Sequence, residues 1–447
     1  MVEAARSGKI QRLATNVLPY ALATLGPVST AVTQFLLSLK MLHMLDAQAF
    51  GNFSFLLVTS VLSCGIWSAL FCAPLPVVLT HYVASEKQSA LRALFTASAV
   101  GAVVAGVLFF GLGEFLHLSH REAGIFAVYA AFALVRWFAR QYAYGNRRVM
   151  RAGASDIAYS VTIVAGLLLA PANAPFEILL AAAIVSLAPF GKFYFSAQFK
   201  NFSLRALPHY FPIWRRYSGW SLLGVVTTEA TANSHAYLVT SFLGAAAFAP
   251  LSASALLIRP IGVVMNALTD FERPRFAHQI HAGDIPAAKS SLLLFRLVLI
   301  ASWVGTALAG WALMTFAPRV VFPPHYSTRE LSIGAAIWMA IAAVRLMRTP
   351  ESALLQAAGV FRPLAMASVV SSGVSLVSVG ALLATYGALP SLAGIFIGEG
   401  VYALWIHRQT RRWFRTVGVQ VKGGAGDESM DDSASARNAP ADTAIKA

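Results

Sequence analysis

The sequence contains little charge and few acidic residues. Only 12% of its 447 residues are charged, with 19 Asp and Glu against 34 Lys and Arg, whereas a soluble domain carries about 25% charged residues. Hydrophobic residues make up 57% of the chain. This balance excludes an ordinary soluble domain. The basic excess does not indicate nucleic-acid binding, because Lys and Arg cluster in short connections between apolar runs, where they set membrane topology.

Cysteine is also scarce, and catalytic motifs are missing. Cys64 and Cys72 lie in one apolar run about two helical turns apart, so they cannot form a disulfide within a helix. The chain has no Gly-x-x-x-x-Gly-Lys-Ser/Thr phosphate loop. It also has no long outer loop with paired acids, such as a membrane glycosyltransferase or polymerase would need. We therefore predict a non-enzyme without a cofactor or a metal site.

Long apolar runs recur along most of the sequence. Each is near the roughly 20 residues that cross a hydrocarbon core of about 30 Å, and an apolar span must satisfy its own backbone hydrogen bonds, so helices are expected. The sequence predicts an all-α polytopic membrane protein with about twelve spans. They cover residues 14–39, 52–80, 92–114, 123–143, 154–171, 176–197, 218–242, 250–271, 290–317, 331–349, 363–386 and 391–407.

The basic residues predict the orientation of these spans. With the N-terminus in the cytoplasm, 29 of the 34 Lys and Arg fall on the cytoplasmic side, and only Lys40, Arg121, Arg319 and Arg329 fall outside, while Arg259 lies within a span. By the positive-inside rule, both termini are expected to be cytoplasmic. The sequence predicts five segments: a cytoplasmic N-terminus (1–13), a first six-helix bundle (14–200), a cytoplasmic linker (201–217), a second six-helix bundle (218–410) and a cytoplasmic tail (411–447) that is first basic and then disordered.

An internal repeat relates the two predicted bundles. A shift of 198 residues places Phe50 on Phe248 and Pro76 on Pro274, and the segments around these residues look alike. In each copy, a span ends near a proline, a short polar helix follows, and the next span begins. Six spans per unit is an even number, so the halves share one orientation. We predict two parallel-related six-helix bundles around a central cavity, with the substrate site between them.

One repeated junction resembles a known family. The stretch "LKMLHMLDAQAFGNFSFLLVTSVL" is similar to the first helix junction of lipid-linked oligosaccharide flippases, the polysaccharide and O-antigen translocases of the multidrug/oligosaccharidyl-lipid/polysaccharide superfamily. The matching residues are Leu45, Asp46, Phe50, Gly51 and Phe53.

Further matches extend the resemblance over about residues 10–410. The second junction, with Leu243, Gly244 and Phe248, and the stretch "PRFAHQIHAGDIPAA" match the family in order and spacing. The resemblance implies a transporter of the bacterial inner membrane that moves an undecaprenyl-diphosphate-linked oligosaccharide between leaflets by alternating access. It also implies H⁺ or Na⁺ coupling, and glycan polymerases and glycosyltransferases as partners.

Ionisable residues within the spans are the candidate site residues. Each costs about 2.5–3.5 kcal/mol on insertion scales, so it usually faces a cavity or a partner. Arg136, Arg259 and Arg345 are the candidates for binding the diphosphate, because a guanidinium can contact phosphate with two parallel hydrogen bonds. The alternatives are interfacial anchoring for Arg136 and Arg345, and a structural ion pair between Arg259 and Glu229.

Three other residues are candidates for coupling to an ion gradient. They are Glu229, Glu399 and His235. The family often carries an acid near the middle of its seventh helix, and here Glu229 comes earlier and His235 later. Glu399, which lies between Gly398 and Gly400, alternatively packs a helix crossing, and His235 alternatively packs in the core.

The sequence is also compatible with two other functions. A drug or small-metabolite antiporter of the same superfamily would have a cavity lined by acids and aromatics. A non-transporting membrane component of glycan assembly would belong to another class.

Overall fold

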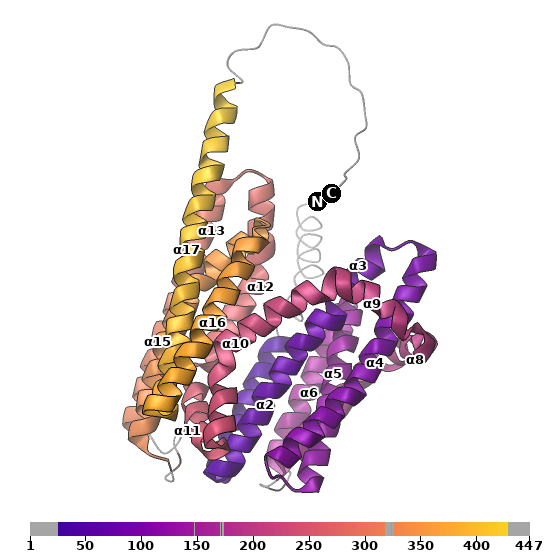
Figure 1. The fold of residues 1–447 in the computed structure, drawn as a ribbon, viewed down its shortest axis with the longest axis vertical. Helices are drawn as coiled ribbons and strands as arrows, with labels where there is room; N and C mark the ends of the chain where they lie inside the picture. Colours follow the sequence, from indigo (N-terminus) through magenta and orange to yellow (C-terminus); the bar gives the residue numbers. More distant parts are fainter. Residues whose placement is uncertain are drawn as a thin grey trace, which may run out of the picture.

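The computed structural model describes residues 26–146, 148–169, 171, 174–317, 323 and 326–427. These residues form helices and no strand (Figure 1). Ten of the helices are long and apolar enough to cross a membrane, which confirms the all-α polytopic fold. Residues 26–44 are also helical, and the start of the first predicted span lies outside the described residues.

The first half and the linker follow the predicted order of spans. After helix 26–44 come α2 (Ala47–Trp67), a π-helical turn (Ser68–Cys72), α3 (Pro74–His81), α4 (Ala84–Phe115), α5 (His120–Gly145), α6 (Val149–Leu169), α7 (Pro175–Val185), a 3-10 turn (Ala188–Phe190) and α8 (Gly191–Asn201). The linker consists of a 3-10 helix (Leu204–His209), α9 (Tyr210–Ile213) and a second π-helical turn (Trp214–Ser218).

The second half repeats this order with a longer last helix. It contains α10 (Gly219–Leu243), α11 (Ala245–Ala255), a 3-10 turn (Leu256–Ile258), α12 (Arg259–His281), α13 (Ile285–Phe316), α15 (Thr328–Ala357), α16 (Phe361–Tyr386) and α17 (Ala388–Asp427). The helix α10 covers the predicted seventh span. The helix α17 continues into the predicted tail as far as Asp427, and residues 428–447 lie outside the described part of the chain.

The repeated junctions turn the chain in two different ways. In the first, the Asp46 side chain accepts a hydrogen bond from the Ala49 backbone N–H at 2.7 Å and so caps α2. In the second, Gly244 separates α10 from α11 with φ of +85°. A residue with a Cβ rarely adopts this conformation. Equivalent turns therefore arise from a polar cap in one copy and from glycine in the other.

The two halves join where these junctions meet. In Figure 1, the N-terminal ends of α2 and α11 lie together at the bottom of the view, and the two groups of helices diverge towards the top. Gly51 of α2 lies so close to α11 that a Cβ added there would stand 1.9 Å from the Ala245 carbonyl oxygen. Next to this contact, the rings of Phe55 and Phe248 meet edge to face, with centroids 6.4 Å apart. The absence of a side chain at Gly51 thus permits direct contact between the halves.

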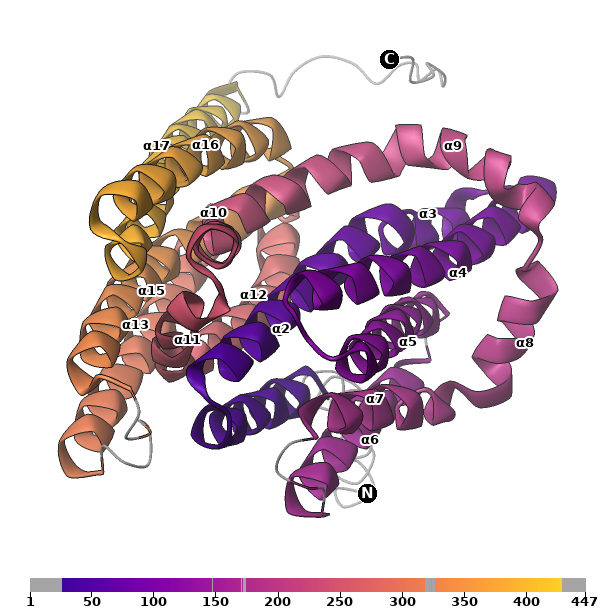
Figure 2. The ribbon, with the colours of Figure 1, turned by 60° about the horizontal axis from the view of Figure 1, so that its bottom comes forward.

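A second contact ties the linker to α2. Pro74 has no N–H, so it cannot bond the carbonyl of Leu70 four residues earlier, as a helix normally requires. That carbonyl instead accepts hydrogen bonds from the Tyr210 hydroxyl at 2.8 Å and the Ser218 hydroxyl at 2.7 Å. Burial raises the pKa of Tyr210 to about 12, so its hydroxyl keeps the donated proton at neutral pH. Figure 2 shows the linker passing beside α4 to reach α10.

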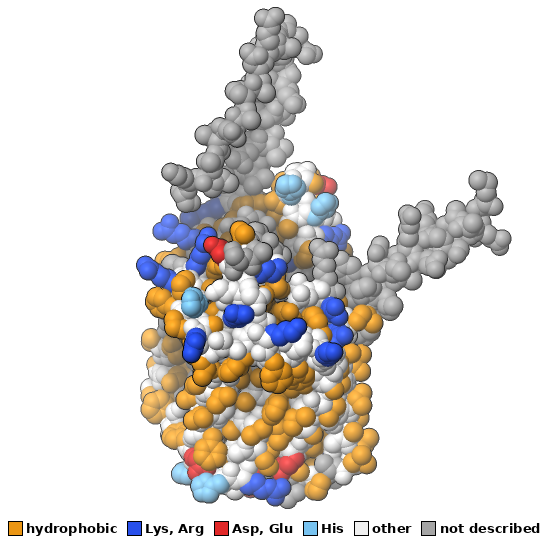
Figure 3. Space-filling model, turned by 90° about the vertical axis from the view of Figure 1, so that its right-hand side faces the viewer, with side chains coloured by type: hydrophobic (Ala, Val, Ile, Leu, Met, Phe, Trp, Pro, Cys, Tyr) orange, Lys and Arg blue, Asp and Glu red, His pale blue; other side chains and the backbone are white. Residues whose placement is uncertain are grey.

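Charge divides the surface into zones. Figure 3 shows a basic collar around the end of the molecule where the halves diverge, an apolar zone below it, and a few charged side chains at the opposite end. The opposite end includes Arg121, which pairs with Glu177 at 3.2 Å. This pattern matches a membrane-embedded apolar zone between two polar surfaces.

We predict that G51A destabilises the protein, because the added Cβ would overlap backbone atoms of α11. Forced overpacking costs about 1–3 kcal/mol, and we expect a lower thermal unfolding midpoint for the purified protein. The matched control is G111A in α4, where a Cβ meets nothing within 4 Å. Equal melting of G51A and G111A would show that the close contact between the junctions is not needed.

Candidate functional site

The first candidate cation, Arg136, belongs to a buried ion cluster within the first half. Arg136 of α5 donates a hydrogen bond from Nη2 to Asp156 Oδ1 at 2.6 Å and from Nε to the Ser155 hydroxyl at 3.1 Å. Arg140, one turn further along α5, contacts Asp156 Oδ2 at 3.0 Å. All three charged side chains are buried, and the Arg136 guanidinium also lies over the Tyr159 ring at 4.6 Å. Arg136 is thus a paired interior residue rather than an interfacial anchor.

Arg345 and Glu399 form a matching cluster in the second half. Arg345 and Arg348 of α15 each donate from Nε to one oxygen of Glu399, both at 2.7 Å. Glu399 of α17 is 1% exposed, and Arg348 lies over the Tyr402 ring at 4.5 Å. One buried Arg345 nitrogen, Nη2, has no hydrogen-bond partner. The cluster therefore keeps one unused donor.

The two clusters have the same pattern of charges, but their acids come from helices at different positions in the repeat. In each half, two arginines one turn apart on the fourth predicted span hold a single carboxylate. The acid comes from α6 in the first half and from α17 in the second, which are different positions in the repeat. Each cluster carries a net charge of +1 when all groups are ionised.

Glycine brings the acid of the second cluster into place. An added Cβ at Gly398 would lie 2.6 Å from the Ser375 Cβ, and one at Gly394 would lie 2.4 Å from the Val379 backbone nitrogen. Small residues four apart let two membrane helices approach closely. A close helix crossing lies beside Glu399 and involves Gly398 and Gly394, whereas Gly400 has nothing within 4 Å.

Arg259 occupies a different environment, between the two halves. Its Nη1 donates to the Ser38 hydroxyl at 2.9 Å and to the Gln34 carbonyl at 3.5 Å, both on helix 26–44. Within the described residues it contacts no carboxylate, so it does not pair with Glu229. The 3-10 turn Leu256–Ile258 interrupts the helix just before Arg259. The chain thus places an uncompensated cation against neutral oxygens of the opposite half.

Glu229 lies on α10 among uncharged polar groups. It is half-buried and accepts a hydrogen bond from Asn233 Nδ2 at 2.7 Å. Towards α16, Thr227 and the Ser368 hydroxyl lie 2.9 Å apart, and the Ser375 hydroxyl donates to the Thr231 carbonyl at 3.2 Å. The helix α10 is not among the ten apolar spans, because Glu229, Asn233 and His235 add to these hydroxyls along its length.

His235 is buried in an aromatic environment. It is 3% exposed, and its ring centroid lies 5.9 Å from that of Phe248 and 5.2 Å from that of Trp338. Its Nδ1 has no hydrogen-bond partner among the described residues. The structure therefore gathers Glu229, His235, Arg345 and Glu399 in the second half, and leaves Arg136 in the first half and Arg259 between them.

A third ion cluster lies near the basic end of the second half. Glu351 of α15 accepts from Arg296 Nη2 at 2.8 Å and contacts His407 Nδ1 at 2.9 Å. These three residues, together with Arg348, line a pocket of about 260 Å³ between α13, α15 and α17.

Several of these partners were missed in the sequence. Asp156 stands inside the predicted fifth span, and an intramembrane acid is a usable signal. Arg140 follows Arg136, and Arg348 follows Arg345, by about one helical turn. Side chains at this spacing lie on the same face of a helix, so they can contact the same group. Ser38 carries no such signal, because an isolated serine in an apolar helix is common.

Comparison with known proteins places the fold. No family model and no curated protein matches the chain. An inward-facing multidrug resistance MATE family transporter of the MOP superfamily matches with a TM-score of 0.64 at 13% identity, covering 88% of this chain and 99% of that one. The lipid II flippase MurJ, in an inward closed conformation, matches with a TM-score of 0.64 at 14% identity, covering 88% of this chain and 87% of that one.

The chain has the fold of the MOP-superfamily transporters. An outward-facing MATE transporter of this superfamily also matches, with a lower TM-score of 0.57 at 15% identity, over 90% of this chain and 96% of that one. The higher score of the inward-facing MATE structure agrees with halves that meet at one end and diverge at the other (Figure 1). These matches confirm the predicted all-α polytopic membrane fold.

We predict that E399Q destabilises this MOP-type fold strongly. Removing the charge of the buried Glu399 leaves the half-buried Arg345 and Arg348 without their counter-ion, and breaking a buried ion pair costs about 3–5 kcal/mol. Thermal unfolding of the purified protein measures the effect. The control is E114Q, because Glu114 pairs with an exposed His120, and such surface pairs contribute about 0–1 kcal/mol. If E399Q melted like E114Q, the cluster would not be a structural ion pair.

Proposed function

We propose that this protein is a flippase that translocates a lipid-linked oligosaccharide, carried on undecaprenyl diphosphate, across the bacterial inner membrane by alternating access. Two lines support the proposal. The chain shares the MOP-superfamily fold with the lipid II flippase MurJ, and the family resemblance of its junctions points the same way. The single observation that carries the proposal is the environment of Arg259.

Arg259 has the properties of a phosphate-binding cation. A guanidinium inside a membrane is costly unless a partner neutralises it. Arg136 and Arg345 have carboxylate partners, whereas Arg259 has, among the residues that the structure describes, only Ser38 and the Gln34 carbonyl. An anionic substrate group would supply the missing charge, and the planar fork of Arg suits a diphosphate. Because its two contacts lie on the other half, relative motion of the halves would change how Arg259 is held.

Arg136 and Arg345 remain in the proposal as secondary phosphate contacts. Each of their clusters holds two guanidiniums and one carboxylate, which leaves a net positive charge. Arg345 has the stronger case, because its Nη2 is without a hydrogen-bond partner. Arg136 directs Nε and Nη2 to Ser155 and Asp156, so fewer of its donors remain.

For ion coupling, we propose Glu229 as the principal residue. Among the described residues, its hydrogen-bond donor is the neutral amide of Asn233. A carboxylate in such a site can take up a proton or Na⁺ as its surroundings change. Glu399 is held by two guanidiniums, and His235 lies in an aromatic environment. They remain secondary coupling candidates, and Glu399 is in direct contact with Arg345.

The membrane orientation follows from the basic collar. We propose that the basic end, where the halves diverge, faces the cytoplasm, with both termini on that side. Substrate would then enter from the cytoplasmic leaflet, where glycosyltransferases assemble lipid-linked glycans, and leave towards a polymerase on the far side.

A drug antiporter is the second candidate function. The observation that favours it is the match to MATE transporters, whose TM-score of 0.64 equals that of MurJ. The two functions differ in charge preference, because a cavity with an uncompensated arginine suits an anionic substrate rather than a cationic drug. Competition by undecaprenyl diphosphate against a labelled cationic drug, measured with the purified protein, distinguishes them.

We predict that R259Q reduces flipping of a fluorescent undecaprenyl-diphosphate-oligosaccharide about a hundredfold in proteoliposomes. The variant loses a charge-assisted contact to phosphate, which is worth about 1.5–3 kcal/mol. R259K should retain part of the activity. The control is R362Q, which removes an exposed arginine at the start of α16. Flipping at the wild-type rate by correctly inserted R259Q would remove Arg259 from the site.

We predict that E229Q separates coupling from transport. The amide oxygen of Gln can still accept the Asn233 hydrogen bond, but the side chain no longer takes up a proton or cation. Proteoliposomes with an imposed H⁺ or Na⁺ gradient should lose gradient-driven accumulation, and equilibration without a gradient should persist. Gradient-driven accumulation by E229Q equal to that of the control E114Q would rule out Glu229 as the coupling residue.

A further inference from the structure

The last helix, α17, is much longer than a membrane span. Its 40 residues correspond to about 60 Å at 1.5 Å per residue, about twice the thickness of the hydrocarbon core. About 20 residues counted from Ala388 reach the neighbourhood of Arg408. The rest of the helix therefore projects from the basic end of the molecule, as Figure 1 shows. Residues around Arg408 are expected to lie at the level of the lipid headgroups.

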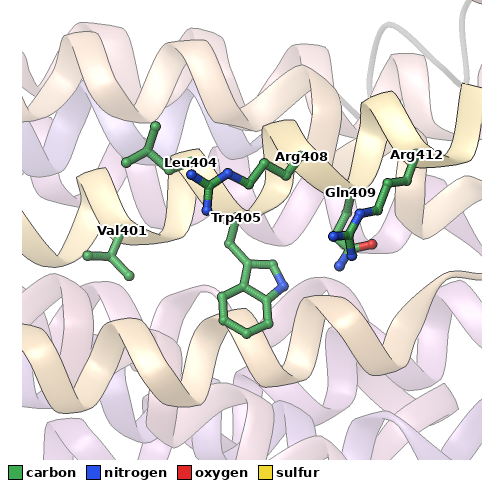
Figure 4. Close-up of a pocket in the computed structure, with 6 residues that line it drawn as sticks. All are labelled: Val401, Leu404, Trp405, Arg408, Gln409 and Arg412. Carbon is green, nitrogen blue, oxygen red and sulfur yellow. The ribbon is translucent and has the colours of Figure 1, made fainter.

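A pocket of about 310 Å³ lies at this level on α17. Figure 4 shows that its lining changes along the helix, from Val401 and Leu404 through Trp405 to Arg408, Gln409 and Arg412. The apolar end faces the membrane interior and the cationic end faces the surface. A phospholipid has the same polarity, with acyl chains below a charged headgroup.

The arginines of this pocket differ from those inside the helix bundles. Arg408 and Arg412 are exposed, and neither contacts a carboxylate in the part of the chain that the structure describes. Arg296, Arg345 and Arg348, by contrast, each bind one. The charge at the pocket thus has no counter-ion from the neighbouring helices, and one turn of α17 presents both guanidiniums to the same side.

Trp405 adds an unused donor to the same place. Its indole nitrogen is buried and has no hydrogen-bond partner, and Figure 4 places it on the side towards Gln409 and Arg412. The ring itself packs against the cluster of Leu355, Leu364, Ala367 and Ile406, so its position is fixed. The guanidinium, amide and indole groups of this pocket all supply N–H donors, and the amide oxygen of Gln409 is the one acceptor among them.

We propose that this pocket binds the headgroup phosphate of an anionic phospholipid of the surrounding bilayer. Arg408 and Arg412 contact the phosphate oxygens, Trp405 and Gln409 complete the donor set, and an acyl chain lies along Val401 and Leu404. Basic pockets at the cytoplasmic surface of membrane proteins suit such headgroups, and tryptophan is favoured at this depth. This site is independent of the proposed flippase activity.

The test compares two double variants of the full-length protein. R408Q/R412Q removes both pocket arginines, and R411Q/R415Q removes two exposed arginines of the same helix that do not line the pocket. Binding of phosphatidylglycerol and of phosphatidylcholine is measured by native mass spectrometry, and unfolding in phosphatidylcholine nanodiscs checks that both variants are folded. We expect about thirtyfold weaker phosphatidylglycerol binding in R408Q/R412Q, given about 1 kcal/mol for each of the two basic residues near an anionic surface, and a much smaller change in the control.

Two results would overturn the proposal. Equal loss in both variants would mean that the helix attracts anionic lipid only through its overall charge. Unchanged phosphatidylglycerol binding with weaker undecaprenyl diphosphate binding in R408Q/R412Q would assign the pocket to the transported lipid instead. A third variant, W405F, keeps the ring packing but removes the indole N–H, and a selective loss of phosphatidylglycerol over phosphatidylcholine in W405F would support the donor assignment.

Discussion

The contact between Gly51 and the Ala245 backbone is the constraint on which the arrangement of the two halves depends. Two helices approach so closely there that no side chain fits between them. The Phe55 and Phe248 rings close the space beside it, and the rest of the two bundles diverges from this point. A tight contact at one end and separation at the other is the geometry that alternating access requires, since motion about the joined end changes the opposite face.

The second constraint is the cost of charge in a medium of low dielectric constant. A buried ion pair roughly offsets the loss of hydration only when its geometry and remaining hydrogen bonds are good. The clusters around Asp156 and Glu399 have good contact geometry, with distances of 2.6 to 3.1 Å, although Arg345 Nη2 in the second cluster has no hydrogen-bond partner among the described residues. Such clusters hold helices together within a half. Arg259 departs from the rule, because its contacts are neutral, and departures from charge compensation are where binding of a charged substrate is to be sought.

The linker is attached to the first half where a proline and π-helical turns interrupt the regular helices. Pro74 leaves the Leu70 carbonyl without its helical donor, and Tyr210 and Ser218 of the linker take that place. The linker is therefore fixed to the second helix of the first half by side-chain hydrogen bonds instead of by apolar packing alone.

The sequence by itself determined the helical membrane fold, the repeat and the positions of the ionisable residues. Runs of apolar residues can span a bilayer only as helices, and the duplicated junctions around Phe50 and Phe248 marked the two halves. Only the tertiary structure decided which of those residues are paired. Arg136, Arg259 and Arg345 look alike in the sequence as arginines in apolar surroundings. The acids that neutralise Arg136 and Arg345 lie on helices 20 and 54 residues away, and the hydroxyl beside Arg259 lies 221 residues away. Pairing over such separations depends on how helices pack, and local sequence periodicity carries no information about it.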